Sequence, residues 1–259
     1  MKKLKPIDKI SSKIVAAFLK NKIITPIPSK YCKNIKLADK FRKLCESKVK
    51  KPIIGFKAGG TAIPVLKKLG EKEPFIAGVY KHNFLTSGKS VKINKYTLGI
   101  ELEVCYLIKK TFFSHKGSVT TKNITKFISH MAPCIEVVGY RQKKIGIKYL
   151  GDLSSDFGAN IKFLIGSKQK FKKIDIGNLK TIIKNNSSNH SVNGNTNTVY
   201  INPINSCKFV LKKLKKDKIK LNNNFYVFTG STVGVVPLIK KGVYTGFIQK
   251  LGSVKAKIT

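Results

Sequence analysis

The sequence is poor in acidic residues, in arginine and in tryptophan. Of its 259 residues, 12 are Asp or Glu, two are Arg and none is Trp. No apolar run approaches the ~18 residues that a membrane-spanning helix needs, and the basic N-terminus lacks the apolar core of a signal peptide. We therefore expect a cytoplasmic protein that does not span a membrane.

Closely spaced cysteine pairs are missing as well. The five Cys residues are scattered along the chain and form no C-x-x-C pair. Neither a disulfide framework nor a zinc ribbon is therefore indicated, and a reducing compartment is the simplest location. The length suits one large domain or two small ones, with enough residues to bury a hydrophobic core.

Basic residues, in contrast, are abundant. The 52 Lys and Arg residues give a formal net charge of +40, which favours binding to polyanions. Nucleic-acid sites prefer Arg, however, and all but two of these cations are Lys, spread along the whole chain beside much Asn and Ile. An AT-rich genome would produce this composition. We expect weak, salt-sensitive adhesion to polyanions but no specific nucleic-acid partner.

Helical periodicity occurs in three stretches. The spacing of apolar residues predicts helices over 7–20, 37–49 and 205–216. The rest is dominated by short β-runs, which we expect at 75–80, 98–108, 133–140, 159–165, 198–202, 225–229 and 243–258. The polar stretch 185–198 contains Asn193-Gly194, which predicts an exposed hairpin or loop. The pattern indicates an α+β fold with a mainly antiparallel or mixed sheet, a helical N-terminal section (1–50) and a β-rich part (51–259).

Three of the 12 acidic residues lie in apolar strands, where an unpaired carboxylate is costly to bury. In the run IELEVCY, residues 100–106, alternate side chains share a face, so Glu101 and Glu103 lie on one side with Cα atoms about 7 Å apart. Glu136, in a second apolar run, can supply a third oxygen. Three carboxylates without His suit Mg²⁺ or Mn²⁺. The alternative is the solvated face of an ordinary edge strand.

Other polar residues have both a functional and a structural interpretation. Lys57 follows an apolar strand and precedes a glycine pair, so it can project into a cleft, although most lysines of this chain must be solvated. Arg141 can bind a substrate carboxylate or form an internal salt bridge. The segment Thr229-Gly230-Ser231 can offer hydroxyl and N–H groups to an anion, or it forms a plain turn.

Six short segments then occur in a recognisable order. They are GFKAGGT (55–61), IELEV (100–104), APCIEVVGYR (132–141), DFGANIKFLIG (156–166), FTGSTVGVVP (228–237) and LGSVKAKI (251–258). Together they resemble the 2-keto-4-pentenoate hydratase family, which is part of the fumarylacetoacetate hydrolase superfamily. The resemblance extends from about residue 7 to the C-terminus.

The resemblance implies a mixed β-roll or sandwich that carries Mg²⁺ or Mn²⁺ and assembles into a homo-oligomer. It places the metal ligands at Glu101, Glu103 and Glu136, in agreement with the strand argument. The family's Lys and Asp fall on Lys57 and Asp156, and its T-G-S turn falls on residues 229–231. By this resemblance Lys57 and Asp156 are catalytic, while Arg141 and Thr229, Gly230 and Ser231 bind the substrate.

The implied reaction is the metal-dependent addition of water to a 2-hydroxy-2,4-dienoate or its 2-oxo-4-enoate tautomer. The product is a 4-hydroxy-2-oxo acid, formed in aromatic catabolism. We expect a Lys57 pKa lowered by the neighbouring cation, as proton transfer near neutrality requires. Three alternatives stay open: a decarboxylase of 4-oxalocrotonate or oxaloacetate, a C–C hydrolase, and an inactive homologue that binds metal or polyanions.

The chain departs from the family's motifs at three places. Gly139 stands where an Asp is usual, Phe157 replaces an Asn, and Gly60-Thr61-Ala62 replaces an L-T-S segment. None of these positions is a metal ligand, so the departures concern the substrate and the reaction.

Overall fold

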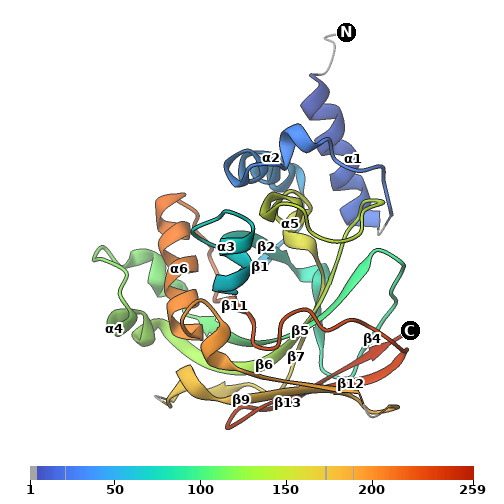
Figure 1. Ribbon diagram of the computed structural model, residues 1–259. Coiled ribbons are helices and arrows are strands. Elements are labelled where there is room, and N and C mark those ends of the chain that lie inside the picture. The colour runs from blue at the N-terminus through green and yellow to red at the C-terminus, as the bar shows by residue number, and fades with distance from the viewer. Residues whose placement is uncertain (1–4, 21, 173, 189) are drawn as a thin grey trace.

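The computed structural model describes residues 5–20, 22–172, 174–188 and 190–259 and contains two β-sheets with helices around them (Figure 1). The helices are α1 (Pro6–Lys20), α2 (Ile35–Lys48), α3 (Ile63–Lys68), α4 (Thr121–Ile124), α5 (Leu150–Ser155) and α6 (Pro203–Lys216). The strands are β1 (Ile53–Gly59), β2 (Phe75–Tyr80), β3 (Phe84–Thr86), β4 (Ser90–Val91), β5 (Thr97–Ile108), β6 (Ile128–Gly139), β7 (Asn160–Ile165), β8 (Gln169–Lys170), β9 (Lys180–Asn185), β10 (Ser191–Asn195), β11 (Phe225–Ser231), β12 (Gly242–Ile248) and β13 (Gly252–Ile258).

The larger sheet has eight strands in the order β2-β1-β11-β5-β6-β7-β3, with β8 paired to β6. It is mixed, because β1 runs parallel to β11 and β3 runs parallel to β7, whereas the other pairs are antiparallel. The smaller sheet has the order β10-β9-β12-β13-β4. The long central strands β5 and β6 therefore lie in the middle of the larger sheet, with neighbours on both sides.

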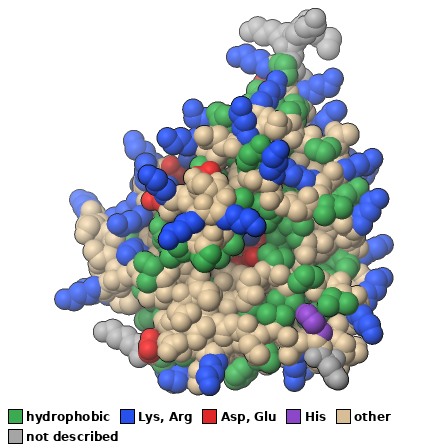
Figure 2. Space-filling model, in the orientation of Figure 1, with side chains coloured by type: hydrophobic (Ala, Val, Ile, Leu, Met, Phe, Trp, Pro, Cys, Tyr) green, Lys and Arg blue, Asp and Glu red, His purple; other side chains and the backbone are tan. Residues whose placement is uncertain are grey.

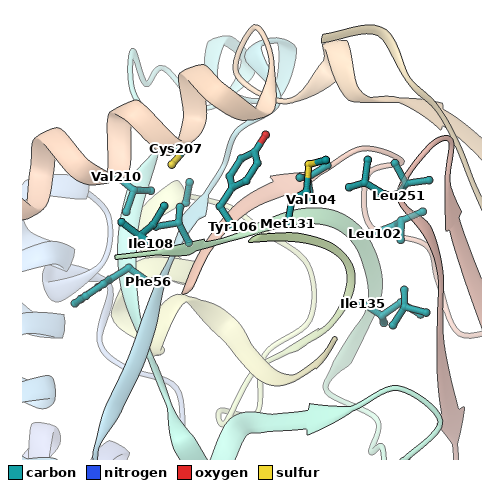
Figure 3. Close-up of a cluster of buried hydrophobic side chains, with 14 of the residues drawn as sticks. Phe56, Leu102, Val104, Tyr106, Ile108, Met131, Ile135, Cys207, Val210 and Leu251 are labelled. Atoms are coloured by element: carbon teal, nitrogen blue, oxygen red, sulfur yellow. The ribbon is translucent and has the colours of Figure 1, made fainter. Parts of the chain in front are cut away.

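The main hydrophobic core lies between the larger sheet, the smaller sheet and α6. Alternate residues of β5 (Leu102, Val104 and Tyr106) are fully buried in this core, as the period of two in a strand requires. Figure 3 shows Cys207 and Val210 of α6 packed over this face of the sheet. The opposite face of β5, which carries the two glutamates, is therefore turned away from the main core.

The N-terminal helices lie beside α5 and the edge strand β2 of the larger sheet (Figure 1). Ile14 and Phe18 of α1 and Phe41 of α2 share a buried cluster with Tyr80 and Phe157. The predicted domain boundary at residue 50 stays a prediction, but the two helices pack against residues that follow it.

The predicted α+β class with a mixed sheet is confirmed, and the three long helices lie where the apolar spacing placed them. The predicted strand over 198–202 is wrong. Tyr200 and Ile201 have φ values of 40° and 77°, in the left-handed region that a strand cannot use. The run 243–258 forms two strands, β12 and β13, joined by a turn.

Asn193-Gly194 is not the turn of a hairpin, as the dipeptide predicted. Both residues lie inside β10, paired with Ile182 and Thr181 of β9, and the chain reverses earlier. Gly194 is needed for another reason, since a Cβ atom there would lie 2.1 Å from the carbonyl oxygen of Thr232. None of the helices within the described part of the chain is long and apolar enough to cross a membrane.

Candidate metal centre and active site

Three carboxylates meet on the face of β5 and β6 that is turned away from the main core. Glu101 pairs directly with Glu136 across the two antiparallel strands, and Glu103 lies two residues further along β5. One carboxylate oxygen of each residue lies within 4.8 Å of the other two. Like charges placed opposite each other destabilise a sheet, so this cluster needs a compensating positive charge.

The carboxylates are not satisfied by the protein alone. Glu103 and Glu136 are completely buried, yet Glu103 Oε1 and Glu136 Oε2 have no hydrogen-bond partner among the described residues. Burial, and next the charge of Glu136, raises the pKa of Glu101 to about 8 and raises that of Glu103 well above its ordinary value. Buried oxygens without partners, in a set of hard ligands only, fit a divalent cation such as Mg²⁺ or Mn²⁺.

Lys57 supplies positive charge beside the carboxylates. Its Nζ lies 2.5 Å from Glu136 Oε1 and donates to the carbonyl oxygen of Gly158 at 3.0 Å. Burial alone would lower the pKa of Lys57, but the carboxylates of Glu136, Glu101 and Glu103 outweigh burial and raise it. The pKa shift of Lys57 is thus opposite to the lowering expected from the sequence, because the charges nearest to its ammonium group are carboxylates and not the cation that the expectation assumed.

The turn at residues 229–231 holds a carboxylate in place. The pairing of β11 with β5 shifts register between Phe228 and Ser231, which frees the N–H of Gly230 to donate to Glu103 Oε2 at 3.0 Å. Gly230 has a φ of 101°, and a Cβ there would lie 2.0 Å from the hydroxyl of Thr61. Thr229 is buried and donates to the carbonyl of Val104, so its hydroxyl is occupied inside the sheet.

Arg141 and Asp156 pair with each other in the interior. Arg141 Nη1 lies 3.1 Å from Asp156 Oδ1, while Asp156 Oδ2 accepts from the N–H of Arg141 and from Gln142 Nε2. Neither residue lines the cavity described below. For Arg141, the structure shows the internal salt bridge, the second of the two interpretations that its sequence position allowed.

Asp156 also precedes an unusual turn. The next three residues, Phe157, Gly158 and Ala159, have φ values of 52°, 75° and 55°. Two residues of this turn make specific contacts. The ring of Phe157 stacks on that of Phe18, with 4.0 Å between the ring centroids, and the carbonyl oxygen of Gly158 accepts a hydrogen bond from Lys57 Nζ. The Arg141–Asp156 pair thereby fixes the segment that orients Lys57.

A cavity of about 340 Å³ opens beside the carboxylates. Lys57, Glu101, Gly230 and Ser231, all predicted from the sequence, line it. Figure 2 shows a hollow in which an acidic side chain is visible, with hydrophobic side chains beside it. The hydroxyl of Ser231 donates to the carbonyl of Gly234 at 2.7 Å, so this side chain shapes the cavity wall.

Sequence reasoning missed part of the cavity wall. Asn193, Gly194 and Thr198 line it because the edge strand β10 and the turn after it lie beside the segment 230–235. Val65 of α3 and Ile147 of the loop before α5 also line it. These residues belong to segments with no chemical motif, so only the fold brings them to the site.

The sequence is similar to those of two proteins named 2-keto-4-pentenoate hydratase. Over 209 residues, 80% of this chain and 78% of the other, it is 22% identical to the 2-keto-4-pentenoate hydratase of Burkholderia vietnamiensis. Over 211 residues, with the same coverage, it is 23% identical to that of Paraburkholderia phymatum. The predicted resemblance is confirmed. No protein-family model matches the chain.

The chain also shares its fold with solved structures. The 4-oxalocrotonate decarboxylase from Pseudomonas putida G7, complexed with magnesium and adipate, matches with a TM-score of 0.84 and 18% identity over 100% of both chains. The fumarylpyruvate hydrolase from Pseudomonas aeruginosa, in complex with Mn²⁺ and pyruvate, has a TM-score of 0.58 and 12% identity, over 82% of this chain and 92% of that one. The predicted fold of the fumarylacetoacetate hydrolase superfamily is confirmed.

Proposed function

We propose that this protein is a divalent-metal-dependent hydratase. Its substrate is a 2-hydroxy-2,4-dienoate or the 2-oxo-enoate tautomer, and its product is a 4-hydroxy-2-oxo acid. The observation that carries the proposal is the cluster of Glu101, Glu103 and Glu136, which has two buried oxygens without partners beside Lys57 and an open cavity. The similarity to curated hydratases supports the choice of reaction.

The three glutamates are the residues that would hold Mg²⁺ or Mn²⁺. When bound there, the ion would supply Lewis-acid polarisation of the oxo group of a 2-oxo acid. Gly230 keeps Glu103 oriented by its N–H, and Lys57 keeps Glu136 oriented by its ammonium group. Such supporting contacts fix ligand geometry and strengthen metal binding.

Lys57 is the residue that transfers protons in this proposal. In the dienol form the substrate loses the proton of its 2-hydroxyl group and gains one at C5, which gives the conjugated 2-oxo-3-enoate. Water then adds its oxygen at C4 and a proton at C3. The ammonium group of Lys57 stabilises negative charge at the C2 oxygen and can return a proton to carbon.

Asp156 and Arg141 have no contact with the substrate in this proposal, since neither lines the cavity. Because both are buried and bonded to each other, they hold the turn 157–159, whose Gly158 carbonyl orients Lys57. We therefore assign them a positioning role and leave the contact with substrate to residues that line the cavity.

An ultraviolet assay tests the proposal. With Mg²⁺ or Mn²⁺, the wild-type protein should remove the dienol absorbance of 2-hydroxypenta-2,4-dienoate and form 4-hydroxy-2-oxopentanoate without CO₂, and EDTA should stop the reaction. Glu136→Gln and Lys57→Met should lose turnover, whereas Lys162→Met, which removes a lysine that donates to the carbonyl of His82, should retain it. Turnover that survives EDTA, or that persists in Glu136→Gln, would reject the metal mechanism.

Decarboxylation is the second candidate, because the fold matches 4-oxalocrotonate decarboxylase over the whole chain. The two reactions differ in one product. Release of CO₂ from 4-oxalocrotonate or oxaloacetate, faster than hydration of the dienoate, would favour the decarboxylase over the hydratase.

We extend the proposal to assembly as a homo-oligomer in the cytoplasm. Protomers with a net charge of +40 repel one another at low salt. Light scattering after gel filtration at moderate ionic strength should therefore report a mass that is a multiple of 28.8 kDa. A mass of one protomer at all concentrations would contradict this extension.

A further inference from the structure

The smaller sheet turns one face to the main core and leaves its other face uncovered. Ile183 of β9 and Ile248 of β12 are buried in the core. Because successive side chains of a strand point to opposite faces, their neighbours Ile182 and Phe247 point outward. In Figure 1 this sheet forms the lower margin of the molecule, and the labelled helices lie above it. The outer face of the smaller sheet is therefore accessible to a partner.

An exposed aromatic ring lies within this outer face. Phe247 is 45% exposed, and no other Phe or Tyr of the described residues is more than half-buried to this extent. It pairs with Ile182 of β9 on one side and with Ser253 of β13 on the other. A lysine lies over the ring of Phe209, for example, but in the described part of the chain none lies over Phe247. This ring is free to stack on a planar ligand.

Lysines lie beside the ring on both neighbouring strands. Lys184 of β9 and Lys255 of β13 both pair with Thr245, which precedes Phe247 by two residues on β12 and shares its face. Residues in such diagonal positions have Cα atoms about 7–8 Å apart, a distance that a lysine side chain can span. Lys257 follows on the same face of β13, and all three lysines are exposed. The ring and the three ammonium groups therefore form one surface.

Acidic residues are missing from this sheet. The strands β4, β9, β10, β12 and β13 contain no Asp or Glu, and the chain contains none after Asp217. A second copy of the protein that docked through the same face would place lysine against lysine, which is unfavourable. A polyanion, in contrast, gains affinity from every lysine that neutralises a phosphate. Charge complementarity therefore selects a polyanionic partner for this face.

The exposed ring narrows the class of polyanion. Lysines alone attract any polyanion, but a free aromatic ring adds stacking on a planar base. Only bases that are not stacked within a duplex can use such a ring, which favours a single strand. A hollow of about 360 Å³ adjoins the ring, and its lining includes Ile182, Lys184, Asn186 and Ser191. This hollow offers polar groups next to the stacking position.

We propose that the outer face of the smaller sheet binds single-stranded nucleic acid without sequence preference. Phe247 stacks on a base, while Lys184, Lys255 and Lys257 contact neighbouring phosphates. Because the ammonium group of lysine is a point charge without the fork of arginine, these contacts carry no base readout. The surface gives the attraction expected from the net charge of +40 a defined location, and it does not depend on the proposed hydratase activity.

Fluorescence anisotropy with a labelled oligothymidylate of about 12 nucleotides tests the role of the ring. Phe247→Ala should weaken binding at least about fivefold without a change in melting temperature, because the side chain is exposed. Leu37→Ala is the matched control, because Leu37 is 42% exposed and lies on helix α2; it should bind as the wild type does. An abasic strand with the same number of phosphates should bind wild type at least about fivefold more weakly, and Phe247→Ala should not weaken it further.

Salt dependence tests the role of the lysines. Between about 50 and about 200 mM salt, the combined variant Lys184→Gln and Lys255→Gln should reduce the slope of log affinity against log salt by about 1.4, since each contacted phosphate of a single strand contributes about 0.7. Lys36→Gln with Lys40→Gln removes the same charge from exposed positions of α2. This control should leave the slope unchanged.

Four results would overturn the proposal. The first is no binding of the oligothymidylate at about 50 mM salt. Equal binding of the abasic strand, or equal losses in the two lysine variants, would show that net charge alone causes the adhesion. A fall in mass to one protomer of 28.8 kDa in Phe247→Ala, measured by light scattering, would assign the face to contact between copies. None of these results bears on the proposed hydratase activity, whose glutamates lie on the larger sheet.

Discussion

Two buried clusters of charge in this protein differ in how completely their carboxylate oxygens are hydrogen-bonded, although Arg141 Nε in the first has no partner among the described residues. In the first, both oxygens of Asp156 accept hydrogen bonds from Arg141 and Gln142. In the second, Glu103 and Glu136 each keep one buried oxygen without a partner in the described structure. The two clusters lie on neighbouring segments, and Lys57 and Gly158 connect them.

The difference separates two roles that the sequence could not separate. A buried ion pair whose carboxylate oxygens are all hydrogen-bonded holds a fixed conformation, and removal of one partner is strongly destabilising. A buried carboxylate cluster with free oxygens is unfavourable without a ligand, so its position is explained by what it binds. Asp156 and Glu136 are both buried acids, but only the second leaves room for an ion.

The largest expected effect is on stability, from the satisfied cluster. Arg141→Met leaves the Asp156 carboxylate buried without its cation, which should lower the free energy of unfolding by about 3–5 kcal/mol. Urea denaturation measures this change. Lys213→Met, which removes the exposed ion pair with Glu73, should cost less than about 1 kcal/mol. A similar cost for both variants would remove the distinction.

The unsatisfied cluster should show the opposite behaviour. Glu103→Gln deletes a metal ligand, so calorimetry should show that Mn²⁺ affinity falls by at least about 100-fold. The free energy of unfolding of the metal-free protein should stay the same or rise, because the substitution removes a carboxyl group that burial already disfavours in its charged form. Destabilisation as large as that of Arg141→Met would show that Glu103 is structural.

The two clusters should also differ in their response to pH. The pKa of Glu101 rises from its ordinary 4.5 to about 8 on folding, so its neutral form favours the folded state. Stability from this group is complete below pH 4.5 and is lost as pH rises through about 8. The melting temperature of the EDTA-treated protein should therefore fall over this interval.

Mn²⁺ should reverse that dependence. Binding requires charged carboxylates and releases protons, so affinity should increase by up to about tenfold per pH unit for each proton released. At saturating Mn²⁺ the decline in melting temperature should disappear. A metal affinity that is constant between pH 5 and about 8 would contradict the raised pKa values.

The smallest effect is expected where the N-terminal helix contacts the satisfied cluster. The ring of Phe18 stacks on Phe157 and lies 4.7 Å from the guanidinium carbon of Arg141. Phe18→Leu keeps an apolar side chain but loses both contacts, which should reduce the unfolding free energy by about 1–2 kcal/mol. Mn²⁺ affinity should not change, and a large loss of affinity would show that α1 shapes the metal site directly.

The sequence predicted the carboxylate cluster because acidic residues are scarce and the period of a strand is simple. Glu101 and Glu103 alternate with Leu102 and Val104, so their common face follows from local geometry. The position of Glu136 opposite Glu101 depends on the register between two distant strands. Local pattern does not give this register, and the resemblance to a known family was what placed Glu136 with the other two glutamates. The fold class followed from the same information.

Other features lay beyond local pattern. Asn193-Gly194 has the composition of a turn, but the close approach of Thr232 requires the glycine within a strand. Tyr200 and Ile201 have apolar strand-like side chains but adopt left-handed conformations just before Asn202 caps α6. The sequence allowed Arg141 to pair with a substrate carboxylate or with an internal acid, and only the folded position of Asp156 distinguishes the two.

The exposed mouth of the cavity has a consequence for how this protein can change over generations. Val65, Ile147 and Val235 line the cavity and are 43%, 38% and 38% exposed, and substitutions at exposed positions usually change stability by no more than about 0.5 kcal/mol. The glutamates, in contrast, lie on central strands that tolerate little variation. Under the proposed function, substitutions at these exposed positions can change which ligand is preferred while the three glutamates stay the same.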